Sequence, residues 1–258
     1  MKDRPLALRA CLYYLSYMGD RDKLPDKKLP NRAGPGAVEA FVKKLAAMPV
    51  VRPAGARGRL IFSLDATASR QPTWDRACEL QAEMFTEAAS LGGLDVQLVF
   101  YRGFGEFEAS RWVGASGELT RRMTGVRCLG GRTQIGRVLR HAITETKARH
   151  VNALVFVGDA MEEGIDELCD LAGQLGVLGL PIFLFHEGRD PVAEAAFQQI
   201  ARLSGGACCP FDAASAKQLR ELLRAVAVYA AGGRKALEDF SRSAGGHALL
   251  LTRQLGKK

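Results

Sequence analysis

From Arg59 onward, apolar stretches of β-strand length alternate with amphipathic helical patterns. Three of these stretches are almost entirely apolar, which is typical of central parallel strands covered on both faces. The stretch at 106–113 follows its predecessor after only a few residues, so we expect it to pair antiparallel, because a parallel crossover needs a dozen or more residues. The six predicted strands are RLIFSLD (59–65), DVQLVFY (95–101), EFEASRWV (106–113), VNALVFVGD (151–159), LPIFLFHE (180–187) and ACCPF (207–211).

The segments between these strands repeat apolar residues at spacings of three and four, which predicts helices. Strands that alternate with helices favour a sheet with helices on both faces. The predicted fold is therefore α/β: a three-layer Rossmann-like fold with a mainly parallel six-stranded sheet and one antiparallel edge strand. The predicted buried helix faces are Trp74, Ala77, Met84, Phe85, Ala88 and Leu91; Ile135, Val138, Leu139, Ala142 and Ile143; Ile165, Leu168, Cys169, Ala172 and Leu175; and Leu219, Leu222, Leu223, Val226 and Ala230.

The two ends of the chain differ from this main domain, which we place at 58–231. In residues 1–57, two short helical patterns flank the segment DRDKLPDKKLPNRAGPG, where proline and charge predict a loop. We interpret 1–57 as an N-terminal helical and loop extension, and 232–258 as a C-terminal helical tail. The residues expected to pack the extension on the main domain are Leu12, Leu15, Phe41 and Leu45.

The composition disfavours nucleic-acid binding and a membrane-spanning protein, but it does not select one function. The net charge of +8 would attract any polyanion, but the basic residues are dispersed and only 7% of residues are aromatic, so a solvated basic surface is favoured over nucleic-acid binding. No apolar run reaches the roughly 18 residues of a membrane helix. The six cysteines form no CxxC pair, which indicates reduced thiols and a cytoplasmic location.

The first predicted strand ends in LDATAS, where Asp65, Thr67 and Ser69 stand at alternate positions before a helix. In open α/β sheets, ligands bind beyond the carboxyl ends of the strands. A carboxylate with two hydroxyls is hard-oxygen chemistry, suited to Mg²⁺, Mn²⁺ or Ca²⁺. The alternative is that these residues are helix caps, which are common at such junctions.

Two further segments place oxygen atoms near the same edge. Thr133 follows the Gly-rich CLGGR just before a predicted helix, and Asp159 ends the apolar strand in VFVGDAMEE. Each also has a simpler interpretation as a cap of the helix that follows it. In the strand order 3-2-1-4-5-6, the first and fourth strands are neighbours, so Asp65 and Asp159 are expected to lie side by side.

Together, DATAS at 65–69, GGRT at 130–133 and GDAMEE at 158–163 resemble the three segments of the metal-ion-dependent adhesion site (MIDAS) of von Willebrand factor A (VWA) domains. The resemblance covers about 57–230 and is to cytoplasmic bacterial VWA proteins. The sequence departs from the family pattern at three positions: Thr67 replaces the usual serine, and Gly158 and Ala160 replace the residues that commonly flank the aspartate.

This resemblance implies a metal site made of Asp65, Thr67, Ser69, Thr133 and Asp159, with Asp159 acting mostly through water. It implies a non-enzymatic interaction module whose Mg²⁺ captures an Asp or Glu side chain of another protein. An AAA+ ATPase, a chaperone-like protein or a stress-response factor in an intracellular complex is the kind of partner that it suggests. Membrane partners are not expected.

Two alternatives remain: a basic nucleic-acid-binding adaptor, and a phosphatase of the haloacid-dehalogenase type. In such enzymes the first aspartate is a nucleophile, and Asp65, Thr133, Lys147 and Asp159 follow the same order. Thr67 replaces the second acid that protonates the leaving group, and Lys147 is expected near the distal end of its helix. The four histidines have no HxxxH or HExxH spacing, which makes zinc hydrolysis unlikely by sequence.

Overall fold

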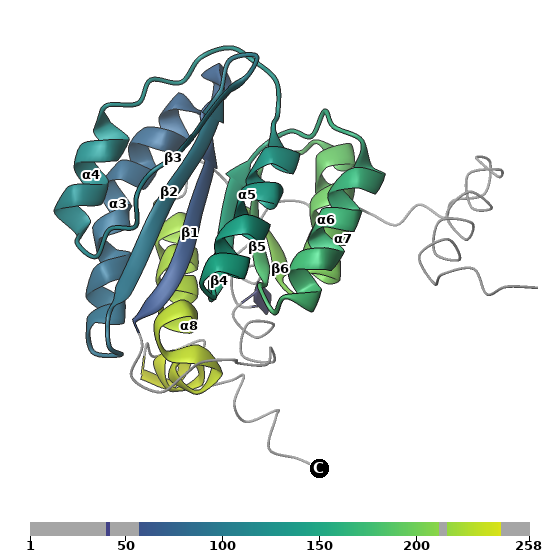
Figure 1. Cartoon of the computed structure of the whole chain (residues 1–258). Helices are drawn as coiled ribbons and strands as arrows, with labels where there is room; N and C mark the ends of the chain where they lie inside the picture. Colours follow the sequence, from purple (N-terminus) through teal and green to yellow (C-terminus); the bar gives the residue numbers. More distant parts are fainter. Residues whose placement is uncertain (1–39, 42–56, 212–215, 244–258) are drawn as a thin grey trace, which may run out of the picture. The chain divides into compact units, whose positions relative to one another are not determined.

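The computed structural model describes residues 40–41, 57–211 and 216–243. In this part of the chain, six strands form one sheet with helices packed on both faces (Figure 1). The strands are β1 (Gly58–Asp65), β2 (Leu94–Arg102), β3 (Glu106–Ala109), β4 (Ala153–Gly158), β5 (Ile182–Glu187) and β6 (Ala207–Phe211). The helices are the 3-10 turn η1 (Ala68–Arg70), α3 (Gln71–Ala89), α4 (Ser116–Thr124), α5 (Ile135–Ala148), α6 (Ile165–Val177), α7 (Pro191–Leu203) and α8 (Ala216–Ser243).

The strands follow the order β3-β2-β1-β4-β5-β6. Every neighbouring pair is parallel except β2 and β3, which form an antiparallel hairpin at one edge. The predicted fold class, the strand order and the antiparallel edge strand are thus confirmed. Because β1 and β4 are neighbours, the carboxyl ends of both strands meet at the upper edge of the sheet in Figure 1.

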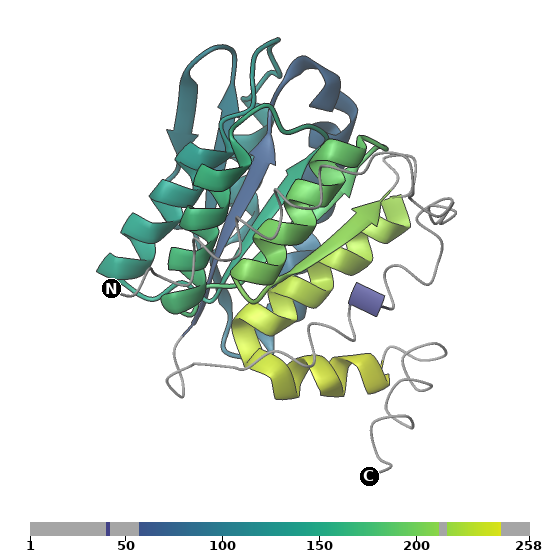
Figure 2. The ribbon, with the colours of Figure 1, turned by 90° about the vertical axis from the view of Figure 1, so that its right-hand side faces the viewer.

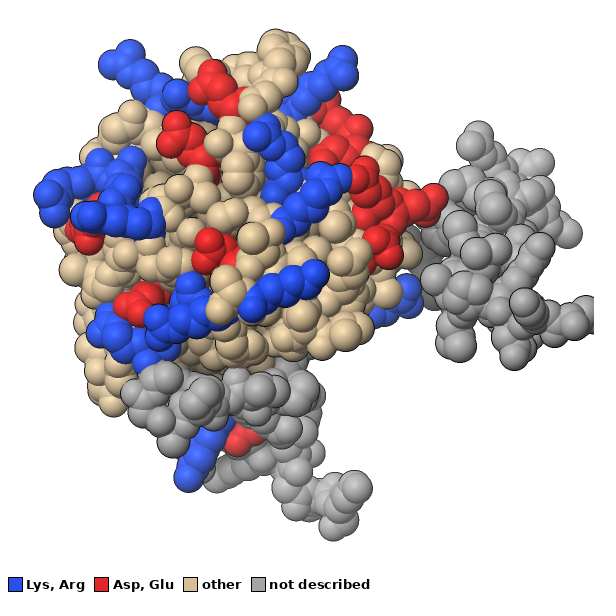
Figure 3. Space-filling model, in the orientation of Figure 1, with Lys and Arg blue, Asp and Glu red and all other residues tan. Residues whose placement is uncertain are grey.

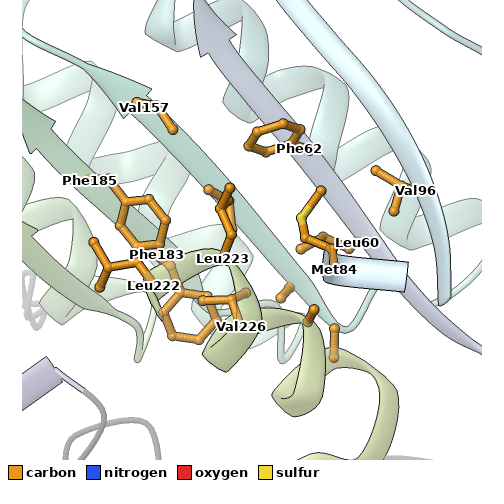
Figure 4. Packing of buried hydrophobic residues seen from close by; sticks show 14 of the residues in the cluster. Leu60, Phe62, Met84, Val96, Val157, Phe183, Phe185, Leu222, Leu223 and Val226 are labelled. Atoms are coloured by element: carbon orange, nitrogen blue, oxygen red, sulfur yellow. The ribbon is translucent and has the colours of Figure 1, made fainter. Parts of the chain in front are cut away.

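Successive side chains of the central strands point to opposite faces and enter two separate cores. Leu60 and Phe62 of β1 pack toward α3 and α8, whereas Ile61 packs toward α5. Figure 4 shows the first of these cores, in which Phe185 of β5 lies beside Leu222 of α8. The sheet is therefore the middle layer, with α3, α4 and α8 on one face and α5, α6 and α7 on the other (Figure 2).

Two elements differ from the prediction. β3 ends at Ala109, where the Ser110 side chain accepts the Leu98 backbone N–H (3.0 Å) in place of a ladder bond, and the predicted antiparallel pairing resumes at a bridge between Val113 and Val96. The short helix α4 was not predicted, since it buries only Leu119 and Met123 and its other residues are mostly polar. These two elements lie at the edge of the sheet, where burial gives the weakest sequence pattern.

Of the four residues expected to pack the N-terminal extension on the main domain, the structure describes only Phe41. Its ring is buried and packs edge-on against Phe183 (5.9 Å between centroids) and Phe185 (5.5 Å). Leu12, Leu15 and Leu45 lie outside the described residues, as do most of the proposed extension and the last part of the proposed tail. The division at 57 and 231 stays a prediction, and α8 itself continues to Ser243 through a kink at Gly233 (φ 74°).

None of the described helices has the length and apolar composition needed to cross a membrane.

Candidate functional site

Asp65 is the last residue of β1 and is 2% exposed. Its position follows from the central place of β1 in the sheet, because both neighbouring strands continue beside it. After Asp65 the chain turns at once, and the Arg70 backbone N–H donates to the Thr67 carbonyl (2.9 Å) to close the turn η1. The predicted site residues of this segment therefore lie at the carboxyl edge of the sheet.

The two oxygens of the Asp65 carboxylate have different surroundings. Oδ1 accepts the Thr67 backbone N–H (2.8 Å), as a turn-capping aspartate does. Oδ2 is buried and has no hydrogen-bond partner among the described residues. The nearby hydroxyl of Tyr101 lowers the pKa of Asp65 but lies outside ordinary hydrogen-bond geometry. Oδ2 is thus a buried acceptor that still needs a partner.

Burial controls the titration of Asp65. Desolvation raises its pKa from 3.8 to about 6, and the charge of Asp159 adds to the rise, while the hydrogen bonds from Thr67 oppose it. The same surroundings act on Tyr101, whose pKa is raised well above its ordinary value by burial and by the Asp65 charge. The Tyr101 hydroxyl therefore keeps its proton beside the carboxylate at neutral pH.

Ser69 connects the end of β1 to the end of β4. Its hydroxyl donates to Asp159 Oδ2 (3.2 Å) and lies 3.5 Å from the Thr67 hydroxyl. Asp65, Thr67, Ser69 and Asp159 are thus joined in one chain of contacts, as the strand order predicts. Asp159 does not cap α6, because that helix begins at Ile165 without a side-chain cap.

Arg70 was not predicted as a site residue. Its guanidinium Nη2 lies 3.1 Å from Asp159 Oδ2, and its Nη1 pairs with Glu187 at the end of β5. Thr73 also donates to Glu187. Because the Arg70 and Glu187 side chains are only about a tenth exposed, this ion pair is largely shielded from water. Arg70 therefore shares its single positive charge between Glu187 and Asp159 and links the ends of β4 and β5.

Thr133 belongs to a second set of contacts on the same edge. Its hydroxyl accepts the Glu162 backbone N–H (3.0 Å), and its own backbone N–H donates to Glu162 Oε2 (3.0 Å). Thr133 does not cap α5, since the backbone N–H groups of Ile135 (2.5 Å) and Gly136 (2.8 Å) donate to Glu163. These contacts fix Thr133 against the loop that follows Asp159, and leave its hydroxyl proton and a second lone pair available.

The chemistry of these side chains fits a hard cation. Within the described residues, no group of three or more His, Cys, Asp or Glu side chains is placed to hold a metal ion. The candidate set instead combines two carboxylates with three hydroxyls, which are oxygen donors suited to Mg²⁺. The unpartnered Oδ2 of Asp65 is the atom that such an ion would satisfy. Asp159 Oδ2 is already engaged by Ser69 and Arg70, which fits an indirect role.

Of the site residues that were not predicted, Glu187 has a recognisable sequence pattern, whereas Arg70, Glu162 and Glu163 have none. Glu187 ends the apolar strand β5 in the same way that Asp65 ends β1 and Asp159 follows β4, which is a readable pattern. Arg70 stands directly after Ser69, but nothing in its spacing indicates which acids it meets. Glu162 and Glu163 read as part of an acidic turn, and only the fold shows that they bind the loop before α5.

No protein-family model matches this chain, and no curated protein sequence does either. Several solved structures share its fold. The SpRpn10 VWA domain matches with a TM-score of 0.51 at 13% identity, over 65% of this chain and 94% of that one. The fold is VWA-like. A serine-substituted variant of an aerotolerance-related membrane protein from Bacteroides fragilis gives a TM-score of 0.50 at 15% identity, over 64% of this chain and 96% of that one.

The PilB minor pilin from Streptococcus sanguinis has the same VWA-like fold, with a TM-score of 0.52 at 11% identity over 76% of this chain and 65% of that one. At these identities the likeness concerns the fold alone. The VWA-like architecture places the edge that carries Asp65 and Asp159 at the carboxyl ends of the strands. In such sheets this is the usual position of a ligand site.

The raised pKa of Asp65 predicts that its charge destabilises the metal-free fold. Because the folded state holds the proton more tightly than the unfolded state, the free energy of unfolding should fall as pH rises between 3.8 and about 6, and level off above that range. With metal ions chelated at neutral pH, Asp65→Asn should raise the free energy of unfolding by up to about 3 kcal/mol. Urea unfolding followed by circular dichroism across this pH range measures both effects.

The matched control is Asp166→Asn, which removes an exposed carboxylate of α6. It should leave both the stability and its pH dependence close to those of the wild type. An Asp65→Asn variant that is less stable than the wild type at neutral pH would show that the Asp65 charge does not destabilise the metal-free fold.

The Arg70 network predicts a second stability effect. Arg70→Met leaves Glu187 buried without its cation, so the free energy of unfolding should fall by about 3 kcal/mol or more. Arg70→Lys should be intermediate, because a single ammonium cannot bridge both carboxylates as the guanidinium does. The control is Arg76→Met, which breaks an exposed pair with Glu79 and should cost well under about 1 kcal/mol. Equal losses in Arg70→Met and Arg76→Met would show that the network is not stabilising.

Proposed function

We propose that this chain is a metal-ion-dependent protein-interaction module. Asp65, Ser69 and Thr133 bind a divalent cation, Mg²⁺ or in its place Mn²⁺ or Ca²⁺, with Thr67 as a further hydroxyl and Asp159 acting through water. The observation that carries this proposal is the buried Oδ2 of Asp65, which has no partner among the described residues at the ligand-binding edge of a VWA-like fold.

The residues around the proposed ion would make the site selective for an Asp or Glu side chain of a partner protein. Arg70 pairs with Asp159, whereas Asp65 has no Lys, Arg or His partner within 4.0 Å among the described residues. An ion with few anionic ligands remains electrophilic, and a bound Mg²⁺ supplies an open coordination position for an Asp or Glu side chain of another protein. Thr133, held by Glu162, and Ser69, bound to Asp159, orient their hydroxyls before any partner arrives.

Two observations favour binding over catalysis. Lys147, the cation that a phosphatase of the haloacid-dehalogenase type requires, is exposed near the last turn of α5. Because α5 starts at the carboxyl edge of the sheet, twelve residues of helix separate Lys147 from the helix start by roughly 18 Å. Thr67 also supplies no acid for the leaving group. We therefore propose no enzymatic activity.

We place the module in a cytoplasmic complex of the bacterial type, with an AAA+ ATPase or another subunit that presents an acidic side chain as its partner. The free thiols of Cys78, Cys128 and Cys169 are consistent with a reducing compartment. Basic and acidic side chains alternate over much of the face in Figure 3, and the acidic ones gather on the side of α6. This mixed surface supports a protein partner over nucleic acid.

Isothermal titration of the full chain with MgCl₂ or MnCl₂ tests the metal site. The wild type should show saturable binding at one site, and Asp65→Ala should abolish it, because the ion loses the buried carboxylate oxygen that is proposed to bind it. Asp166→Ala, the matched exposed carboxylate on α6, should bind as the wild type does.

Unchanged titration heat in a folded Asp65→Ala variant would overturn the proposal. Turnover of p-nitrophenyl phosphate that is lost in Asp65→Asn would also overturn it, and would support the phosphatase alternative instead.

A further inference from the structure

The turn between β2 and β3 presents an aromatic side chain to water. Phe104 is 85% exposed and stands between Gly103 and Gly105 at the tip of the hairpin. The turn requires Gly103, whose φ is 60°. A large apolar ring left in water forgoes roughly 2 kcal/mol of burial free energy, and this ring lies at the same edge of the sheet as the candidate site.

The hairpin tip is held from the side by the segment that leads into α5. The Gly103 carbonyl accepts the Arg132 backbone N–H (3.2 Å), and the Gly105 carbonyl accepts Arg137 Nη1 (2.7 Å). Gly131 packs so closely that an added Cβ would lie 2.0 Å from the Gly103 oxygen. Phe104 therefore stands on a tethered turn, so ordering it on binding costs little conformational entropy.

A second exposed apolar residue lies in the loop that adjoins the hairpin. Leu129 is 41% exposed, and its backbone N–H donates to the carbonyl of Ala66, the residue after Asp65 (3.0 Å). Two residues earlier, the Arg127 carbonyl accepts Arg102 Nη1 from the hairpin (2.9 Å). Leu129 is thus fixed between the hairpin and the turn that carries Asp65.

The same loop carries unpaired positive charge. Arg127 and Arg132 are exposed, and neither has a carboxylate within 4.0 Å among the residues that the structure describes. On the other side of Thr133, the acids Glu162 and Glu163 are engaged by backbone N–H groups. We define the hairpin surface as Phe104, Arg127, Leu129 and Arg132. It combines two exposed apolar side chains with two exposed arginines.

We propose that the hairpin surface binds an acidic segment of the partner protein that carries at least one large apolar side chain, next to the carboxylate captured at the metal site. This inference rests on the proposed function and names the chemistry of its partner. The apolar side chain packs on Phe104 and Leu129, while flanking carboxylates meet Arg127 and Arg132, which steers the encounter by charge.

Selection of a random dodecapeptide display library on the immobilised full chain, in millimolar MgCl₂, tests this proposal. Enriched peptides should combine Asp or Glu with an aromatic or large aliphatic residue. Phe104→Ser and Arg132→Glu should each weaken the binding of these peptides about tenfold or more. The matched controls are Val177→Ser, which removes a 90% exposed apolar side chain of α6, and Arg202→Glu at the end of α7; both should bind as the wild type does.

The outcomes separate this inference from the proposed function. Peptides lost in Asp65→Ala but kept in Phe104→Ser would overturn the hairpin surface and leave the metal site standing. Peptides lost in Phe104→Ser but kept in Asp65→Ala would support the hairpin surface and contradict the metal site. A selection that yields no peptide dependent on Phe104 would overturn the inference, as would enrichment of basic peptides.

Discussion

Burial of the Asp65 carboxylate at the end of the central strand is costly, because water no longer solvates its charge. The fold recovers part of this cost at Oδ1, through the backbone N–H of Thr67. Oδ2 has no hydrogen-bond partner among the described residues, and desolvation raises the pKa of Asp65 although the nearby Tyr101 hydroxyl opposes the rise. We propose that a group from outside the chain, the divalent cation, satisfies this buried acceptor.

The arrangement around Asp65 divides the edge into two regions of different charge. On the side of β4 and β5, Arg70 and Glu187 form a shielded ion pair that also engages Asp159. On the side of the hairpin, Arg127 and Arg132 have no carboxylate partner among the described residues, and they lie in the same loop as the exposed Leu129. An incoming acidic side chain would therefore meet two unpaired arginines on this side and a site whose second carboxylate, Asp159, is already paired with Arg70. Both features favour an anionic ligand over a neutral one.

The sequence predicted the layers of the fold better than the details of the site. Nearly continuous apolar runs, such as LIFSL in β1, predict central strands that are buried on both faces. The short interval between β2 and Glu106 predicts the antiparallel edge strand, because it leaves no room for a parallel crossover. Asp65 and Asp159 could be placed together because strand order alone makes β1 and β4 neighbours. The pairing of Arg70 with Glu187 spans 117 residues and depends on side-chain reach, which periodicity does not encode.

The same limit applies to the loop before α5. Thr133 looks like a helix cap in sequence, yet Glu163 caps α5 from a distant loop and Glu162 orients the Thr133 hydroxyl. Such reciprocal contacts arise only once the fold has brought the loop before α5 against the turn that follows β4. The choice between a capping role and a ligand role for Thr133 is therefore a property of the tertiary fold.

The most direct test of the central claim is a crystal structure of the full chain soaked in MnCl₂, with the anomalous signal of manganese measured. The account predicts one strong peak in contact with Asp65 Oδ2, Ser69 Oγ and Thr133 Oγ1, and separated from Asp159 by water. A well-ordered site without a manganese peak, or with Asp65 Oδ2 bound to a protein donor instead, would contradict it.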